Sequence, residues 1–235
     1  MKQHKMTRLA VALAALGLSF GLMGCGNDQS AKRASATIKD LSSMAVGKLG
    51  GKGKAAPPVD PRVSIETTMR EIPGVPLQFV MQEKTSAYAV TSIYGQNGSV
   101  ITWVGADRKT TSLDRGMLTA TRGFGNDLMS VEDGGAVRLI TTKQAGTVTK
   151  TYRFLDGLER TTRLALTCAI TPGETQSVTS GEISTSARIM RETCQTATGE
   201  FSFTNTYWID AGGRMVQSVQ WASAEIGQLV FRRLR

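Results

Sequence analysis

The chain has 235 residues, with 28 Lys and Arg against 19 Asp and Glu, so its formal net charge is +9 at pH 7. With 40% hydrophobic and 20% charged residues, it is too apolar for a disordered protein and has enough apolar content for one globular domain. The single histidine is His4, so removal of an N-terminal segment would exclude catalysis that depends on an imidazole.

Residues 1–24 have the composition of a secretion signal peptide. A basic start precedes about fifteen apolar or small residues, fewer than the roughly twenty that a membrane-spanning helix needs. The run ends at Leu22-Met23-Gly24-Cys25, which resembles a bacterial lipobox; an ordinary signal peptide with a chance cysteine is the alternative. The resemblance implies that Cys25 is acylated and anchors the protein in the lipid bilayer. Gly26 in place of Asp favours the outer membrane, with the folded domain in the periplasm.

Residues 25–62 are predicted to form a lipidated N-terminus, a short helix and a flexible basic tether. The linker from residue 50 to residue 61 is rich in Gly, Pro and Lys and would have a root-mean-square reach of about 20 Å. Seven basic residues stand against three acidic ones, which fits either attraction to anionic lipid or a solvated linker. The helix is predicted from apolar residues at helical spacing: Ile38, Leu41, Ala45 and Leu49.

Residues 63–235 are predicted to be all-β, as an antiparallel meander that forms a sandwich or a barrel-like single domain. Short alternating segments are separated by turn residues such as Asn97-Gly98 and Asp156-Gly157. Strands are expected near residues 76–84, 86–95, 99–105, 108–113, 117–122, 136–142, 147–155, 160–170, 182–193, 199–209, 214–222 and 228–232.

The same alternation would suit a transmembrane barrel, which needs an apolar outer band. The outward positions of the predicted strands are polar instead, so a periplasmic domain held by its lipid is expected. These positions are Arg163, Thr167, Ser184, Ser186, Arg188, Ser202, Thr204 and Thr206. The body carries 18 basic and 16 acidic residues, and this near-neutral charge gives no support to nucleic-acid binding.

Cys168 and Cys194 remain once Cys25 is acylated. Both lie on predicted strands, with a loop expected at residues 171–173 between them, and in an oxidising compartment they predict a structural disulfide. Two buried free thiols are the alternative. No cofactor, metal site or catalytic residue is predicted, because the processed chain has no histidine, no C-x-x-C and no Gly-rich phosphate loop.

The stretch from residue 99 to residue 128 carries a family resemblance. Trp103 stands at a predicted strand end, and Thr121, Gly123 and Asp127-Leu128 form a Thr-x-Gly-x-x-x-Asp-Leu pattern. This arrangement resembles the YjbF family of outer-membrane lipoproteins, which belong to exopolysaccharide and group 4 capsule systems.

Two positions depart from the pattern of that family. Met117 stands where Arg is common, although Arg115 lies just before Gly116, and Phe124 replaces Leu. The resemblance implies a non-enzymatic accessory lipoprotein that supports assembly or export of exopolysaccharide or capsule. Its partners would be other envelope proteins of polysaccharide export, and polysaccharide itself.

Four residues are candidates for contact with glycan or with a partner: Trp103, Arg115, Arg122 and Asp127. Arginine suits carboxylates and Trp suits sugar rings, but Trp103 is more often a core aromatic and Asp127 more often a turn cap. A glycan hydrolase or lyase using carboxylates, such as Asp114 with Asp127 or Glu132 with Asp133, is one alternative function. A general envelope lipoprotein is another.

Overall fold

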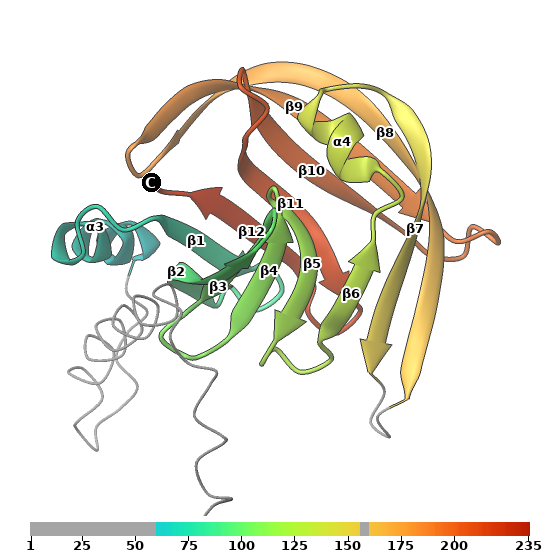
Figure 1. Cartoon of the computed structure of the whole chain (residues 1–235), viewed down its shortest axis with the longest axis horizontal. Coiled ribbons are helices and arrows are strands. Elements are labelled where there is room, and N and C mark those ends of the chain that lie inside the picture. The colour runs from blue at the N-terminus through green and yellow to red at the C-terminus, as the bar shows by residue number, and fades with distance from the viewer. Residues whose placement is uncertain (1–59, 156–159) are drawn as a thin grey trace, which may run out of the picture.

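The computed structural model describes residues 60–155 and 160–235 (Figure 1). Cys25, the helix predicted near residues 38–49 and the Asp156-Gly157 turn lie outside the described residues. Neither helix in the described part of the chain is long and apolar enough to cross a membrane.

Twelve strands form one antiparallel sheet, in the order β5-β4-β3-β2-β1-β12-β11-β10-β9-β8-β7-β6. The two edge strands, β5 and β6, contact each other, so the sheet curls into a nearly closed barrel (Figure 1). The all-β meander is therefore confirmed, in its barrel-like form. The strands are β1 Leu77–Gln82, β2 Tyr88–Asn97, β3 Val100–Val104, β4 Thr110–Asp114, β5 Met117–Arg122, β6 Leu128–Glu132, β7 Gly146–Leu155, β8 Thr161–Ser180, β9 Ile183–Gln195, β10 Ser202–Asp210, β11 Met215–Ser223 and β12 Gly227–Arg233.

The strand predicted for residues 136–142 is wrong, because this segment is helix α4, Ala136–Thr141. Its short apolar run fits both a strand and one buried helical face, and periodicity alone does not separate the two. The preceding residues decide the outcome. Gly134 and Gly135 have φ values of +59° and +93°, and the Asp133 carboxylate accepts a hydrogen bond from the Val137 amide at 3.0 Å. Strand β6, which immediately precedes this turn, was not predicted.

Helix α3, Pro61–Glu71, crosses the predicted end of the tether and was not expected. Asp60 caps it by accepting a hydrogen bond from the Arg62 amide at 2.8 Å, and Pro61 occupies the first turn, where its missing N–H costs nothing. The helix packs against the outer face of β1 and β2, where Phe79 and Leu77 form part of an apolar cluster. These strands are therefore apolar on both faces.

The loop predicted at residues 171–173 is also wrong, because β8 continues through it as far as Ser180. The pairing of β8 with β9 changes register between Pro172 and Thr175. Proline has no N–H to give to a sheet and is tolerated at such an irregularity, which explains why a turn-like sequence lies within a strand.

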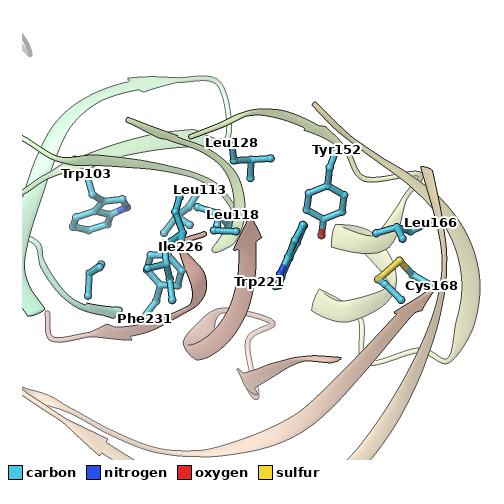
Figure 2. Close-up of a cluster of buried hydrophobic side chains, with 14 residues drawn as sticks. Trp103, Leu113, Leu118, Leu128, Tyr152, Leu166, Cys168, Trp221, Ile226 and Phe231 are labelled. Carbon is cyan, nitrogen blue, oxygen red and sulfur yellow. A yellow bond between two sulfur atoms is a disulfide. The ribbon is translucent and has the colours of Figure 1, made fainter. Parts of the chain in front are cut away.

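The main core fills the barrel, with residues from strands far apart in sequence (Figure 2). Trp221 stacks on Phe203 with 4.6 Å between ring centroids and meets Tyr152 edge-on at 5.5 Å. Cys168 and Cys194 are directly opposed on β8 and β9, are fully buried and form a disulfide. The alternation of the strands thus places large side chains inside and polar ones outside, as the sequence predicts.

Candidate functional site

The family-like pattern forms the turn that joins the two edge strands of the barrel. The Asp127 carboxylate accepts hydrogen bonds from the Thr121 hydroxyl at 2.7 Å, the Gly123 amide at 2.7 Å and the Phe124 amide at 3.2 Å. The Thr121 hydroxyl oxygen in turn accepts from the Leu128 amide at 3.0 Å. Asp127 therefore closes the β5–β6 turn, and its carboxylate is occupied by the backbone around it.

Arg122 belongs to the same turn. Its guanidinium donates to the Leu128 carbonyl at 3.0 Å, which ties the end of β5 to the start of β6. Arg115 lies at the other end of β5, in the two-residue turn between β4 and β5. The structure does not bring Arg115 together with Arg122 and Asp127 in one site.

Trp103 and Arg115 instead share a cavity of about 490 Å³ at one end of the barrel. We call this cavity the basic pocket, after three guanidinium groups in its lining. Trp103 is only 3% exposed and belongs to the core as well. The chemistry of the pocket comes from five side chains: Gln78, Trp103, Arg115, Arg214 and Arg233.

Strand ends and turns position these side chains. Gln78 on β1 and Arg233 on β12 are cross-strand neighbours, and Arg233 has the inward parity of Phe231 in the core. Arg214 lies between the β10–β11 turn and β11. Sequence reasoning missed Gln78, Arg214 and Arg233, although the inward parity of the first and the last was a usable signal.

The charges of the basic pocket are only partly balanced. Arg214 donates to the Asp210 carboxylate through its backbone N–H at 2.9 Å and through Nε at 2.7 Å. Burial raises the pKa of Asp210, but these bonds outweigh burial and hold it below its ordinary value. Burial, with the nearby Arg214 charge, lowers the pKa of Arg233. Within residues 60–155 and 160–235, Arg115 and Arg233 have no ion-pair partner.

A second polar cluster lies inside the barrel, next to the disulfide, and sequence reasoning missed it. Lys150 and Glu192 are 1% and 0% exposed, and the Lys150 ammonium lies 3.1 Å from both oxygens of the carboxylate. Asn205 and Tyr207 donate to Glu192 Oε2 at 2.8 and 2.7 Å. The signal was available, because Lys150 has the same strand parity as Tyr152, and both side chains are buried.

The protonation of this cluster follows from its surroundings. Burial lowers the pKa of Lys150, but Tyr152 and the Glu192 carboxylate outweigh it, so the pKa lies above its ordinary value. Burial and the Glu192 charge raise the pKa of Tyr207 well above its ordinary value, so the hydroxyl keeps its proton. Glu192 also lies within 4.8 Å of both cysteine sulfurs, but these are bonded to each other and are not free to bind a metal.

A family model described as "Group 4 capsule polysaccharide lipoprotein gfcB, YjbF" matches residues 60–234, which is almost the whole described chain. The chain belongs to the YjbF family. No curated protein matches it.

One solved structure supports the fold of this YjbF-family chain. The hypothetical lipoprotein YmcC from Escherichia coli K12 is 15% identical, with a TM-score of 0.65, and the match covers 90% of this chain and 97% of that one. A putative exported protein with a YmcC-like fold from Bacteroides fragilis NCTC 9343 is 11% identical, with coverage of 69% and 94% and a TM-score of 0.30. The first similarity shows the barrel-like fold and carries no information on ligands.

YjbF-family membership places the chain among lipoproteins of the cell envelope, in the context of capsule polysaccharide. Three of the four acids considered for catalysis in the sequence have structural partners in this fold, whereas Asp114 has a buried Oδ1 without a hydrogen-bond partner in the described residues. Asp127 caps its turn, Glu132 binds the Arg153 guanidinium at 2.7 Å, and Asp133 caps α4. Trp208 donates from its indole nitrogen to Gln176 at 3.1 Å.

Proposed function

We propose that this protein is a non-enzymatic, lipid-anchored accessory of exopolysaccharide or capsule assembly or export. It would be held by acylated Cys25 at the periplasmic face of the outer membrane and would act through contacts with envelope proteins and with the glycan. The observation that carries this proposal is the match of the capsule-lipoprotein family model to residues 60–234.

Two further features support the proposal. The lipobox-like sequence ending at Cys25 explains how a domain with polar outer strand faces stays at a membrane. The acids first considered as a catalytic pair, Glu132 and Asp133, bind Arg153 and the start of α4, so they hold the fold together. Binding and positioning of a polymer suit this domain better than its hydrolysis.

The test is deletion of the gene, followed by measurement of secreted polysaccharide and of envelope integrity. Loss of polymer that the intact gene restores, and that a Cys25→Ser variant does not restore, is the expected result. Density-gradient separation of the membranes should find the acylated protein with the outer membrane and the Cys25→Ser protein in neither membrane.

Two results would overturn the proposal. Unchanged polymer together with a leaky envelope would indicate a general envelope lipoprotein. Shortening of the purified polymer by the purified protein, abolished when one acid is replaced, would indicate a glycan-active enzyme.

A further inference from the structure

We propose that the basic pocket binds the carboxylate of an acidic sugar unit. This inference rests on the proposed function and deepens it, because it names the class of polysaccharide that the protein takes and the residues that hold it. Of the contact set predicted from the sequence, the proposal keeps Trp103 and Arg115. To these it adds three residues that the fold brings into the pocket: Gln78, Arg214 and Arg233.

The first argument is charge. Three guanidinium groups line one cavity, and in the described part of the chain only Arg214 has an acid partner there, Asp210. Burial of Arg233 and the nearby Arg214 charge lower the pKa of Arg233 and disfavour its charged form, although the Asp210 carboxylate acts in the opposite direction. A bound carboxylate would relieve that repulsion, and guanidinium groups recognise carboxylates through paired, charge-assisted hydrogen bonds.

The second argument is an unused hydrogen-bond donor. The side-chain nitrogen of Gln78 is buried without a partner, and the residue is only 6% exposed. Buried polar groups are normally hydrogen-bonded, and an unpaired one is costly to the fold. Gln78 lies directly across the sheet from Arg233, so the pocket wall presents an amide donor beside a guanidinium.

The third argument is that two of the arginines, Arg115 and Arg214, stand at tightly packed turns. Arg115 has φ +48°, a left-handed conformation that side chains other than Asn, Asp or Gly rarely adopt, and such strain concentrates at functional sites. The adjacent Gly116 packs so closely on Met215 that an added Cβ would lie 2.7 Å from that side chain. Gly213, next to Arg214, packs in the same way on the Thr141 carbonyl.

The last argument is the shape and lining of the pocket. Its volume of about 490 Å³ falls in the range of roughly 300–1,000 Å³ that is usual for small-molecule sites. Trp103, Ile101 and Leu113 add apolar side chains to the same lining. A sugar ring has both surfaces that this lining needs, since its C–H face is apolar and a uronic acid adds the carboxylate.

The experiment measures binding of defined tetrasaccharides to the full-length mature protein in detergent, by calorimetry at fixed ionic strength. The ligands are tetragalacturonate, a hyaluronan tetrasaccharide that contains glucuronate, and their carboxyl-reduced, uncharged counterparts. The variants are Arg233→Met and Gln78→Met, and the matched control is Arg232→Met. Arg232 is the neighbour of Arg233 on β12 but is exposed on the other face of the sheet.

We expect at least one acidic tetrasaccharide to bind and its reduced counterpart to bind about tenfold more weakly or worse, as loss of a charged hydrogen bond implies. Arg233→Met and Gln78→Met should each weaken binding of the acidic ligand, by about tenfold for Arg233→Met. Gln78→Met should not lower the melting temperature, because it removes a buried amide nitrogen without a hydrogen-bond partner. Arg233→Met removes a half-buried side chain that has no ion-pair partner in the described residues, so its melting temperature should stay close to that of the wild type. Arg232→Met should bind like the wild type.

The inference is overturned if neither acidic ligand binds, if the reduced ligands bind as well, or if Arg232→Met loses as much affinity as Arg233→Met. It is also overturned if inorganic phosphate displaces the tetrasaccharide as effectively as free galacturonate does, because the pocket would then be a general anion site. These outcomes are separate from the gene deletion. Failure to bind alongside loss of secreted polymer would remove the pocket assignment and leave the accessory function standing.

Discussion

Replacement of Lys150 by Met should strongly destabilise the barrel. The substitution keeps most of the side-chain volume but leaves the Glu192 carboxylate, which is 0% exposed, without its counter-ion. Removal of one partner of a buried ion pair costs about 3–5 kcal/mol.

We therefore expect Lys150→Met to lose about 3–4 kcal/mol of unfolding free energy at pH 7. The loss lies in the lower part of that range because Asn205 and Tyr207 still donate hydrogen bonds to Glu192 in the variant. Urea unfolding at pH 7, followed by tryptophan fluorescence, measures this loss.

Two further variants control the experiment. Lys109→Met breaks an exposed pair with Asp107 at 3.2 Å and should cost less than about 1 kcal/mol. The double variant Lys150→Met with Glu192→Gln buries no charge and keeps an acceptor for Asn205 and Tyr207, so it should recover much of the loss. A penalty no larger than that of Lys109→Met would refute the reasoning.

Three other predictions concern the disulfide, the β5–β6 turn that Asp127 closes, and the Asp210 carboxylate. Reduction of Cys168–Cys194, which are 26 residues apart, should lower the unfolding free energy by about 3.5 kcal/mol, measured in urea with and without reductant. Asp127→Ala should cost about 1.5–3 kcal/mol, and Asp127→Asn, which keeps one acceptor, should cost less; equal losses in urea unfolding would contradict the capping role. Burial raises the pKa of Asp210, but the bonds from Arg214 lower it overall, so its stabilisation is present above about pH 4 and is lost as the pH falls through the lowered pKa. Thermal melts should show Asp210→Asn less stable than the wild type at about pH 6, with a difference that narrows toward about pH 2.

The sequence was sufficient for the meander because its evidence is local. The alternation of apolar and polar residues can be recognised within a few residues of sequence. The same holds for turn pairs such as Asn97-Gly98, which lies where β2 meets β3. The disulfide also followed, since Cys168 and Cys194 lie on neighbouring strands. Local evidence failed where one pattern fits two structures, as at residues 136–142, and where a breaker residue such as Pro172 lies at an irregular point of a long strand.

The candidate site was only half predictable, because its parts come from distant segments. Trp103 and Arg115 lie within the family-like stretch, but Gln78 and Arg233 are brought together only by the pairing of β1 with β12. That pairing closes the chain over more than 150 residues, and no short pattern marks it. Asp127 illustrates the opposite case, since its position in a Gly-rich turn already favoured the capping role that the structure shows.

The β5–β6 turn and the basic pocket therefore lie at opposite ends of β5. At one end, Asp127 and Thr121 tie the two edge strands together, in the Thr-x-Gly-x-x-x-Asp-Leu part of the family-like pattern. At the other end, Arg115 shares a pocket with Trp103, and the remaining charges of this pocket come from β12 and the β10–β11 turn. Substitutions at the first end remove hydrogen bonds that the folded state uses, whereas Arg233→Met at the second removes a half-buried charge that has no ion-pair partner in the described residues. The two ends should thus separate experimentally, with stability lost at Asp127 and ligand affinity lost at Arg233.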